Sequence, residues 1–191
     1  MLPHRQRFHA ILAGEELDRP LVDLGGRVAS LSTPAYLALK SHLGFEDILV
    51  DETVTMLNTI GRFDERVLQR FDIGFRRIYL RPASSFTVKF SADSTFKDEW
   101  GVVYRPMGYH NERIGHPLAN ASLVDLDLFP WPEPSDPGRI EGVAEEARLL
   151  SETTGYILAA GHISAGIFQD CWNLRGMGQF MEDLVLNPEF A

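Results

Sequence analysis

Apolar residues recur at intervals of three and four along several stretches of the chain, which is the spacing of one helix face. We expect helices over residues 5–14, 33–44 and 61–71, and another after residue 136. The expected buried face of the third helix consists of Phe63, Val67, Leu68 and Phe71. Asp136 is expected to cap the fourth helix, with Pro137 in its first turn. Its expected buried stripe is Ile140, Val143, Ala144, Ala147 and Leu150. We also expect the closing stretch to be helical, with a new helix start at residues 187–189.

Short apolar runs lie between the helical stretches and predict strands. These runs are LVDLGG after Arg19-Pro20, FRRIYL at residues 75–80 and TGYILAAG at residues 154–161. Residues 86–118 differ, because they alternate apolar and polar side chains and are rich in aromatic residues and turn formers. That pattern predicts an antiparallel hairpin.

The alternation of strands with helices favours a parallel α/β architecture, because parallel strands need crossover connections. The chain holds three or four strand–helix units, whereas a closed (β/α)8 TIM barrel needs eight and about 250 residues. We therefore expect a single α/β domain over residues 1–191 that forms a partial TIM barrel, with an antiparallel hairpin insertion at residues 86–118. Such an open barrel leaves a strand edge uncovered, so the chain is expected to be a homo-oligomer.

Composition narrows the class of partner. The net charge of −9 argues against nucleic acid or an anionic membrane surface as the main partner. No apolar run approaches the roughly 18 residues of a membrane span, and the first 20 residues lack the apolar core of a signal peptide. The single cysteine excludes an internal disulfide framework and suits a reducing compartment. We expect a soluble, cytoplasmic protein.

Five stretches occur in an order that resembles the uroporphyrinogen decarboxylase superfamily. They are the opening helix, DRPLVDLGGR, FDERVLQRFDIGFRRIYLRP, DEWGVVYRPMGYHNERIGHPL and the closing GIFQDCWNLRGMGQFMEDLVLNPEFA. The resemblance implies the N-terminal half of a TIM barrel, with further strands following in the family. It also implies one of two activities: decarboxylation of a tetrapyrrole, or zinc-dependent methyl transfer involving corrinoid proteins and thiols. The hairpin with its Asp-Glu-Trp-Gly motif is more similar to the methyltransferase-like branch.

The resemblance also assigns candidate substrate-binding residues. The decarboxylases hold substrate carboxylates with two arginines four residues apart in the loop after the first strand. Here the second of these matches Arg27 and the first falls on Asp23. An exposed loop arginine is the alternative interpretation of Arg27. The decarboxylases bind the pyrrole N–H groups with an aspartate, whose matching position is about Arg81. A third position, a tyrosine in the family, falls between Phe168 and Trp172.

Further candidates come from the residue types themselves. His162 follows the strand TGYILAAG and could bind a ligand or act as a base, although a loop histidine with a structural role is the alternative. Cys171 could be reactive, but lone cysteines are more often inert. His110 and His116 lack a third zinc ligand nearby. The aromatic residues Trp100, Tyr104 and Tyr109 fit either a pocket wall or sheet packing.

Three functions remain open at this point. The first is methyltransferase-like activity on a small-molecule substrate, with a corrinoid protein as partner. In that case zinc is expected in the full-length form, on a His-x-Cys pair and a later cysteine that this chain does not contain. The second is uroporphyrinogen decarboxylase activity in haem biosynthesis. The third is a non-catalytic fragment or binding module. No metal site or cofactor is expected within this chain.

Overall fold

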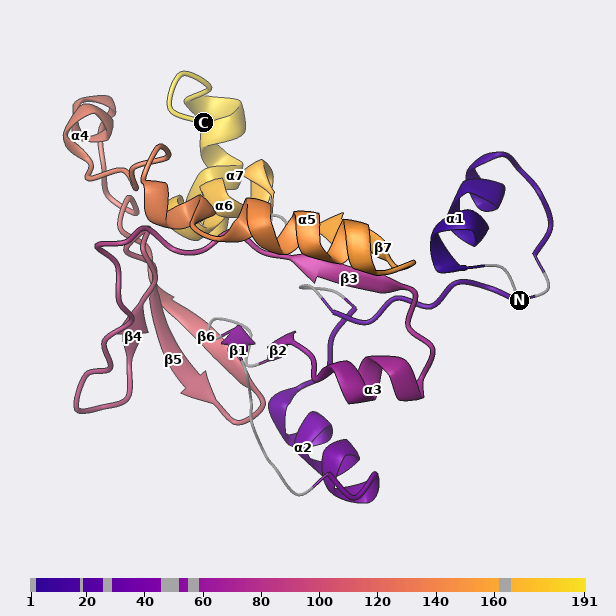
Figure 1. Ribbon diagram of the computed structural model, residues 1–191. Coiled ribbons are helices and arrows are strands. Elements are labelled where there is room, and N and C mark those ends of the chain that lie inside the picture. Colours follow the sequence, from indigo (N-terminus) through magenta and orange to yellow (C-terminus); the bar gives the residue numbers. More distant parts are fainter. Residues whose placement is uncertain (1–2, 18, 26–28, 46–51, 55–58, 162–165) are drawn as a thin grey trace. The chain divides into compact units, whose positions relative to one another are not determined.

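The computed structural model describes residues 3–17, 19–25, 29–45, 52–54, 59–161 and 166–191 (Figure 1). The chain divides into two compact units. Unit 1 comprises Met1–Leu80 and Ile140–His162, and unit 2 comprises Arg81–Arg139 and Ile163–Ala191.

Unit 1 contains a parallel pair of strands with a helix beside it. Its elements are α1 (His4–Leu12), α2 (Thr33–His42), β1 (Glu52–Val54), β2 (Thr59–Arg62), α3 (Glu65–Arg70), β3 (Phe75–Ile78), α5 (Val143–Thr153) and β7 (Ile157–Ala160). Strands β3 and β7 are parallel, and their register runs from Phe75 opposite Ile157 to Ile78 opposite Ala160. Helix α5 leads into β7 and contacts both strands (Figure 1). Strands β1 and β2 form a separate antiparallel pair.

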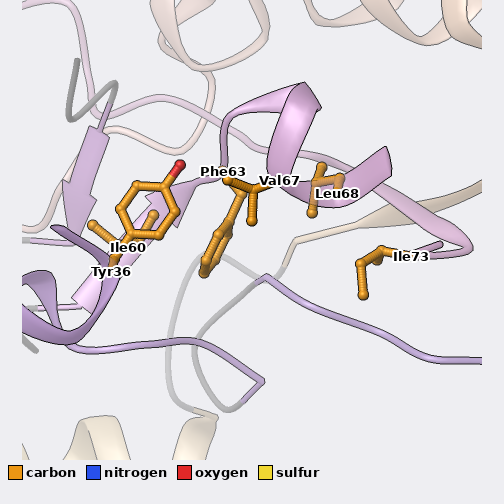
Figure 2. Packing of buried hydrophobic residues seen from close by; sticks show 6 residues of the cluster. All are labelled: Tyr36, Ile60, Phe63, Val67, Leu68 and Ile73. Carbon is orange, nitrogen blue, oxygen red and sulfur yellow. The ribbon is translucent and has the colours of Figure 1, made fainter. Parts of the chain in front are cut away.

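A hydrophobic core lies between α2, β2 and α3. It consists of Tyr36, Ile60, Phe63, Val67, Leu68 and Ile73 (Figure 2). The rings of Tyr36 and Phe63 meet edge to face, with centroids 5.0 Å apart. The helical spacing predicted the burial of Phe63, Val67 and Leu68, which is confirmed. The prediction for Phe71 is wrong: this side chain is 46% exposed, because α3 ends at Arg70 and the chain then turns away at Asp72, which has a φ of 52°.

The segment after Arg19-Pro20 does not form the predicted strand. Residues 21–24 lie outside any strand, and Gly25 makes only an isolated antiparallel bridge to Ala29. One backbone bond joins the segment to the start of β3, from the amide of Gly74 to the carbonyl of Val22, at 3.1 Å. The next residue, Asp23, contacts β3 through its side chain, which accepts a hydrogen bond from Arg77. This side-chain contact stands where a paired strand would have made further backbone hydrogen bonds.

The predicted helix after Asp136 is divided into two parts. Asp136 accepts a hydrogen bond from the amide of Gly138 at 2.8 Å, as a cap should, but the turn that it starts is a 3₁₀ helix, η1 (Pro137–Ile140). Helix α5 begins only after Gly142, whose φ of 72° interrupts the helical backbone. The interruption explains why the predicted stripe is wrong: Ile140 is exposed and no residue of α5 is buried.

Unit 2 combines an antiparallel sheet with helices. Its elements, apart from η1 at the boundary, are β4 (Phe96–Lys97), β5 (Val103–Met107), β6 (His110–Gly115), α4 (Leu123–Leu128), α6 (Ile167–Arg175) and α7 (Met177–Leu186). The three strands are antiparallel in the order β4-β5-β6 and lie inside the stretch 86–118 for which the sequence predicts a hairpin (Figure 1). The predicted helix start at residues 187–189 is wrong, because Asn187 ends α7 and is followed by a turn.

Helices α6 and α7 are held together by a buried carboxylate. Asp183 of α7 is fully buried and accepts hydrogen bonds from Arg175 at 2.6 Å and from Gln179 and Asn187 at 3.1 Å each. The Arg175 guanidinium is the main reason that the pKa of Asp183 lies below its ordinary value. The same guanidinium donates to the carbonyl groups of Leu118 and Ala121, at 2.7 and 2.8 Å. The closing segment therefore fixes the turn that follows β6.

The sheets of the described residues have two, two and three strands, and none closes into a barrel. The parallel β3–β7 pair, with α5 preceding β7, has the arrangement that a crossover connection between parallel strands produces. The partial barrel as a whole stays a prediction.

Candidate functional site

The carboxyl ends of β3 and β7 form the first candidate site, because parallel α/β proteins bind ligands at this edge of the sheet. Tyr79 follows β3 directly and Gly161 follows β7. The amide of Gly161 donates to the carbonyl of Ile78 at 2.6 Å. A Cβ atom on Gly161 would lie 2.7 Å from the Tyr79 ring, so only glycine lets this ring lie against the end of β7.

Asp23 and Arg77 form an ion pair at this site. Arg77 is the third residue of β3, and the two side chains are 29% and 20% exposed. The backbone of Gly25, with a φ of 129°, passes so close that an added Cβ would lie 3.3 Å from Arg77 Cδ. The predicted substrate-binding carboxylate of Asp23 is therefore already bound to a cation from β3. The charges of these two side chains therefore compensate each other.

The preceding residue, Arg76, points to the opposite face of β3, because side chains alternate along a strand. It donates to both carboxylate oxygens of Glu65 at 2.7 Å, and its guanidinium lies 3.5 Å from the centroid of the Tyr156 ring. His4 stacks on the same ring at 5.5 Å. This assembly ties α1 and α3 to the sheet. Sequence reasoning missed the carboxylate partners of both arginines, Glu65 and Asp23; the alternation of side chains along a strand is the signal that could have placed the two arginines on opposite faces.

The remaining predicted substrate-binding residues have different surroundings. Arg81 is exposed, and its amide donates to the carbonyl of Arg139 at 3.0 Å. Trp172 is half-buried in α6, where its ring meets the edge of Phe168 at 5.4 Å. Phe168 in turn packs against Phe180 of α7 at 5.3 Å. Trp172 thus belongs to the packing of α6 against α7. Arg27 and His162 lie outside the described residues.

An anchor in unit 2 holds the backbone next to Arg81. The guanidinium of Arg139 is bound to the carboxylate of Glu99, and its Nε donates to the carbonyl of Glu133 at 2.8 Å. Both charged groups of the pair are mostly buried. The anchor fixes the backbone at Arg81 and leaves its side chain exposed.

The candidate nucleophile and the histidines have structural surroundings. Burial, followed by the nearby charge of Asp170, raises the pKa of the Cys171 thiol and so disfavours the reactive thiolate. His116 is held through Nδ1, which lies 2.7 Å from the carbonyl oxygen of Asn173. His110 is exposed in β6. Within the part of the chain that the structure describes, no three His, Cys, Asp or Glu residues are grouped as a metal site.

The candidate aromatic wall is divided. Tyr104 stacks on Phe96 with centroids 5.2 Å apart, and its hydroxyl donates to Asp98 at 3.1 Å. Burial is the main cause that raises the pKa of Tyr104 to about 12. Trp100 instead meets Trp131 edge to face at 6.3 Å, and Tyr109 is largely exposed. Tyr104 and Trp100 thus pack the antiparallel sheet and the turns around it.

None of the helices in the described ranges is long and apolar enough to cross a membrane. Comparisons of the chain with protein-family models, with curated proteins and with solved structures find no match.

Proposed function

We propose that this chain is part of a methyltransferase-like protein of the uroporphyrinogen decarboxylase superfamily, acting in the cytoplasm on a small methylated substrate with a corrinoid protein as partner. Support comes from the order of the five resembling stretches. The structural observation that favours methyl transfer over decarboxylation is the ion pair between Asp23 and Arg77.

The charge at the carboxyl end of β3 carries the argument. A tetrapyrrole with many carboxylates needs cations that are free to bind them. The decarboxylase pattern has an arginine where this chain has Asp23, and here the aspartate also occupies the guanidinium of Arg77. The pattern needs a carboxylate for the pyrrole N–H groups, and Arg81 stands at that position. Loss of one well-placed stabilising group costs about 3 kcal/mol of transition-state binding. Two such losses leave little decarboxylation, whereas transfer of a methyl group requires neither residue.

The zinc that the resemblance implies does not fit the described residues. His110 and His116 share no third ligand, and His116 is already held by a backbone carbonyl. We therefore derive no step through a metal. The residues of this chain would serve to bind and orient the substrate at the edge formed by Tyr79 and Gly161.

The decarboxylase alternative is tested by incubating the chain with uroporphyrinogen III and separating the products by chromatography. We expect no coproporphyrinogen. Turnover of uroporphyrinogen would reverse the assignment.

The role of the ion pair is tested by binding of uroporphyrin, measured by its absorbance change. The Asp23→Asn variant frees the Arg77 guanidinium, so we expect it to bind this polyanion more tightly than the original chain does. Asp127→Asn is the matched control, because it removes one exposed carboxylate of α4 in unit 2. Equal tightening in both variants would show that only the net charge matters.

The methyl-transfer proposal is tested by titrating the chain with methylcobalamin and following tryptophan fluorescence. Saturable binding is the expected result. If neither methylcobalamin nor uroporphyrin binds, the proposal is wrong and the third interpretation, a non-catalytic fragment or binding module, takes its place.

A further inference from the structure

Two lysines of unit 2 line one hollow of the antiparallel sheet. The chain has three lysines, and Lys40 is fully buried against Asp64 in unit 1. The other two, Lys89 and Lys97, are both exposed and both line a hollow of about 420 Å³. Both exposed lysines of a chain with a net charge of −9 thus lie in the same hollow.

The strand register explains why the two ammonium groups share a face. Phe90 bridges Phe96 in antiparallel fashion, so the next pair outward is Lys89 and Lys97. Side chains directly opposite each other have Cβ atoms about 5 Å apart, and like charges in that position repel. Phe90 packs against Phe96, and Phe96 stacks on Tyr104. An anion between the two lysines would remove the repulsion.

The carboxylates nearest in sequence form no ion pair with either lysine among the described residues. Asp93 accepts hydrogen bonds from the amide and the hydroxyl of Thr95. Asp98 accepts from the amides of Trp100 and Val102 and from the Tyr104 hydroxyl. The ion pairs found among the described residues include neither lysine.

The rest of the hollow offers hydroxyl groups and an apolar wall. The hydroxyl residues are Ser85, Thr87, Ser91 and Thr95, and the apolar ones are Phe86, Phe96 and Val103. Val103 is held in place over Gly115, where a Cβ atom would lie 2.7 Å from its methyl group. The lining therefore combines donors for an oxyanion with a surface for an apolar body.

We propose that the hollow between Lys89 and Lys97 binds a small molecule that carries a phosphate group on an apolar body. A phosphate has close to two negative charges at neutral pH and three acceptor oxygens, which matches two ammonium groups and the hydroxyls beside them. A carboxylate offers one charge and two oxygens and leaves part of the lysine repulsion uncompensated. The site lies entirely within unit 2 and is independent of the proposed methyl transfer.

The test is a titration of the ¹⁵N-labelled chain with phenyl phosphate and with inorganic phosphate at constant ionic strength, followed by NMR. We expect amide shifts confined to residues 85–97 and 103, and tighter binding of phenyl phosphate than of inorganic phosphate. Tighter binding of inorganic phosphate would contradict the apolar part of the proposal. Scattered shifts or no shifts would refute it.

The double variant Lys89→Gln/Lys97→Gln is expected to weaken phenyl phosphate binding at least about tenfold, because it removes two charge-assisted contacts. Arg105→Gln is the matched control: Arg105 is an exposed cation of β5 outside the hollow, so its loss should change the affinity less than about twofold. Equal weakening in the control would mean non-specific attraction. A second readout is reductive methylation of the original chain, in which phenyl phosphate should protect Lys89 and Lys97; undiminished labelling would also overturn the proposal.

Discussion

Lys40 and Asp64 in unit 1 allow a sharp prediction, because removing one partner of their ion pair should cost much more than removing the other. Lys40 is fully buried, and its Nζ lies 2.9 Å from Asp64 Oδ2. The carboxylate of Asp64, 13% exposed, also accepts hydrogen bonds from the amide and Nε of Arg66, both at 2.9 Å. Asp64 therefore has two cationic partners, whereas Lys40 has one anionic partner among the described residues.

The expected magnitudes follow from this asymmetry. Asp64→Ala leaves a buried ammonium without its carboxylate, which costs roughly 3–5 kcal/mol. It also removes the N-cap of α3, which adds about 1 kcal/mol. Lys40→Met keeps most of the buried volume and leaves Asp64 paired with Arg66. We expect it to lower the free energy of unfolding by only about 1 kcal/mol.

Urea denaturation followed by far-UV circular dichroism measures both variants. With a slope of about 2 kcal/mol per molar urea, Asp64→Ala should lower the midpoint by about 2–3 M and Lys40→Met by about 0.5 M. Tryptophan fluorescence provides a control for the location of the effect, because Trp100, Trp131 and Trp172 all lie in unit 2. Equal destabilisation by the two substitutions, or a larger effect of Lys40→Met, would refute the reasoning.

Three further outcomes are expected. The hydrogen bonds from Arg66, with help from Lys40, hold the pKa of Asp64 well below its ordinary 3.8. The contribution of this carboxylate to stability is therefore present above about pH 4 and disappears as the pH falls. Urea midpoints measured between pH 6 and pH 2 should fall more steeply for the original chain than for Asp64→Ala, and parallel curves would contradict this. Gly161→Ala should lower the free energy of unfolding by about 1–3 kcal/mol, because its Cβ would lie 2.7 Å from Tyr79, whereas Gly178→Ala, with nothing within 4 Å, should not be destabilising. Exposed apolar side chains on α6 and α7 favour self-association, which sedimentation equilibrium measures, and a monomer at all concentrations would show that prediction to be wrong.

The sequence predicted an element correctly where the spacing of its apolar residues fits only one type of secondary structure. Helix α2 and strand β7 occupy the expected stretches, since helical spacing and a short apolar run each fit one structure there. The spacing also identified Val67 and Leu68 as core residues. A period does not fix where an element ends. Helix α3 stops at Arg70 and leaves Phe71 exposed, and the left-handed backbone at Gly142 separates η1 from α5.

The candidate site was less accessible to sequence reasoning, because it depends on partners distant in the chain. Asp23 and Arg77 are separated by 54 positions, and the local sequence around either residue does not predict that the other is its partner. The carboxylate of Asp183 is bound by a nearer residue, Arg175, but the spacing of polar residues along the two helices does not reveal that this pair is buried. Which charged residues form ion pairs depends on the fold, so hydrophobic periodicity and composition do not predict these pairs.

The distribution of compensated charge bears on function. The two adjacent arginines of β3 point to opposite faces, and each is matched by its own carboxylate, Glu65 for Arg76 and Asp23 for Arg77. Neither arginine of β3 is therefore free to bind an anionic ligand. Lys89 and Lys97, in contrast, line one hollow, and the ion pairs of the described residues include neither of them. A phosphorylated ligand is thus expected at the two lysines of the antiparallel sheet. The Lys89→Gln/Lys97→Gln variant, which should lose that ligand, should still show tighter uroporphyrin binding when Asp23→Asn is added.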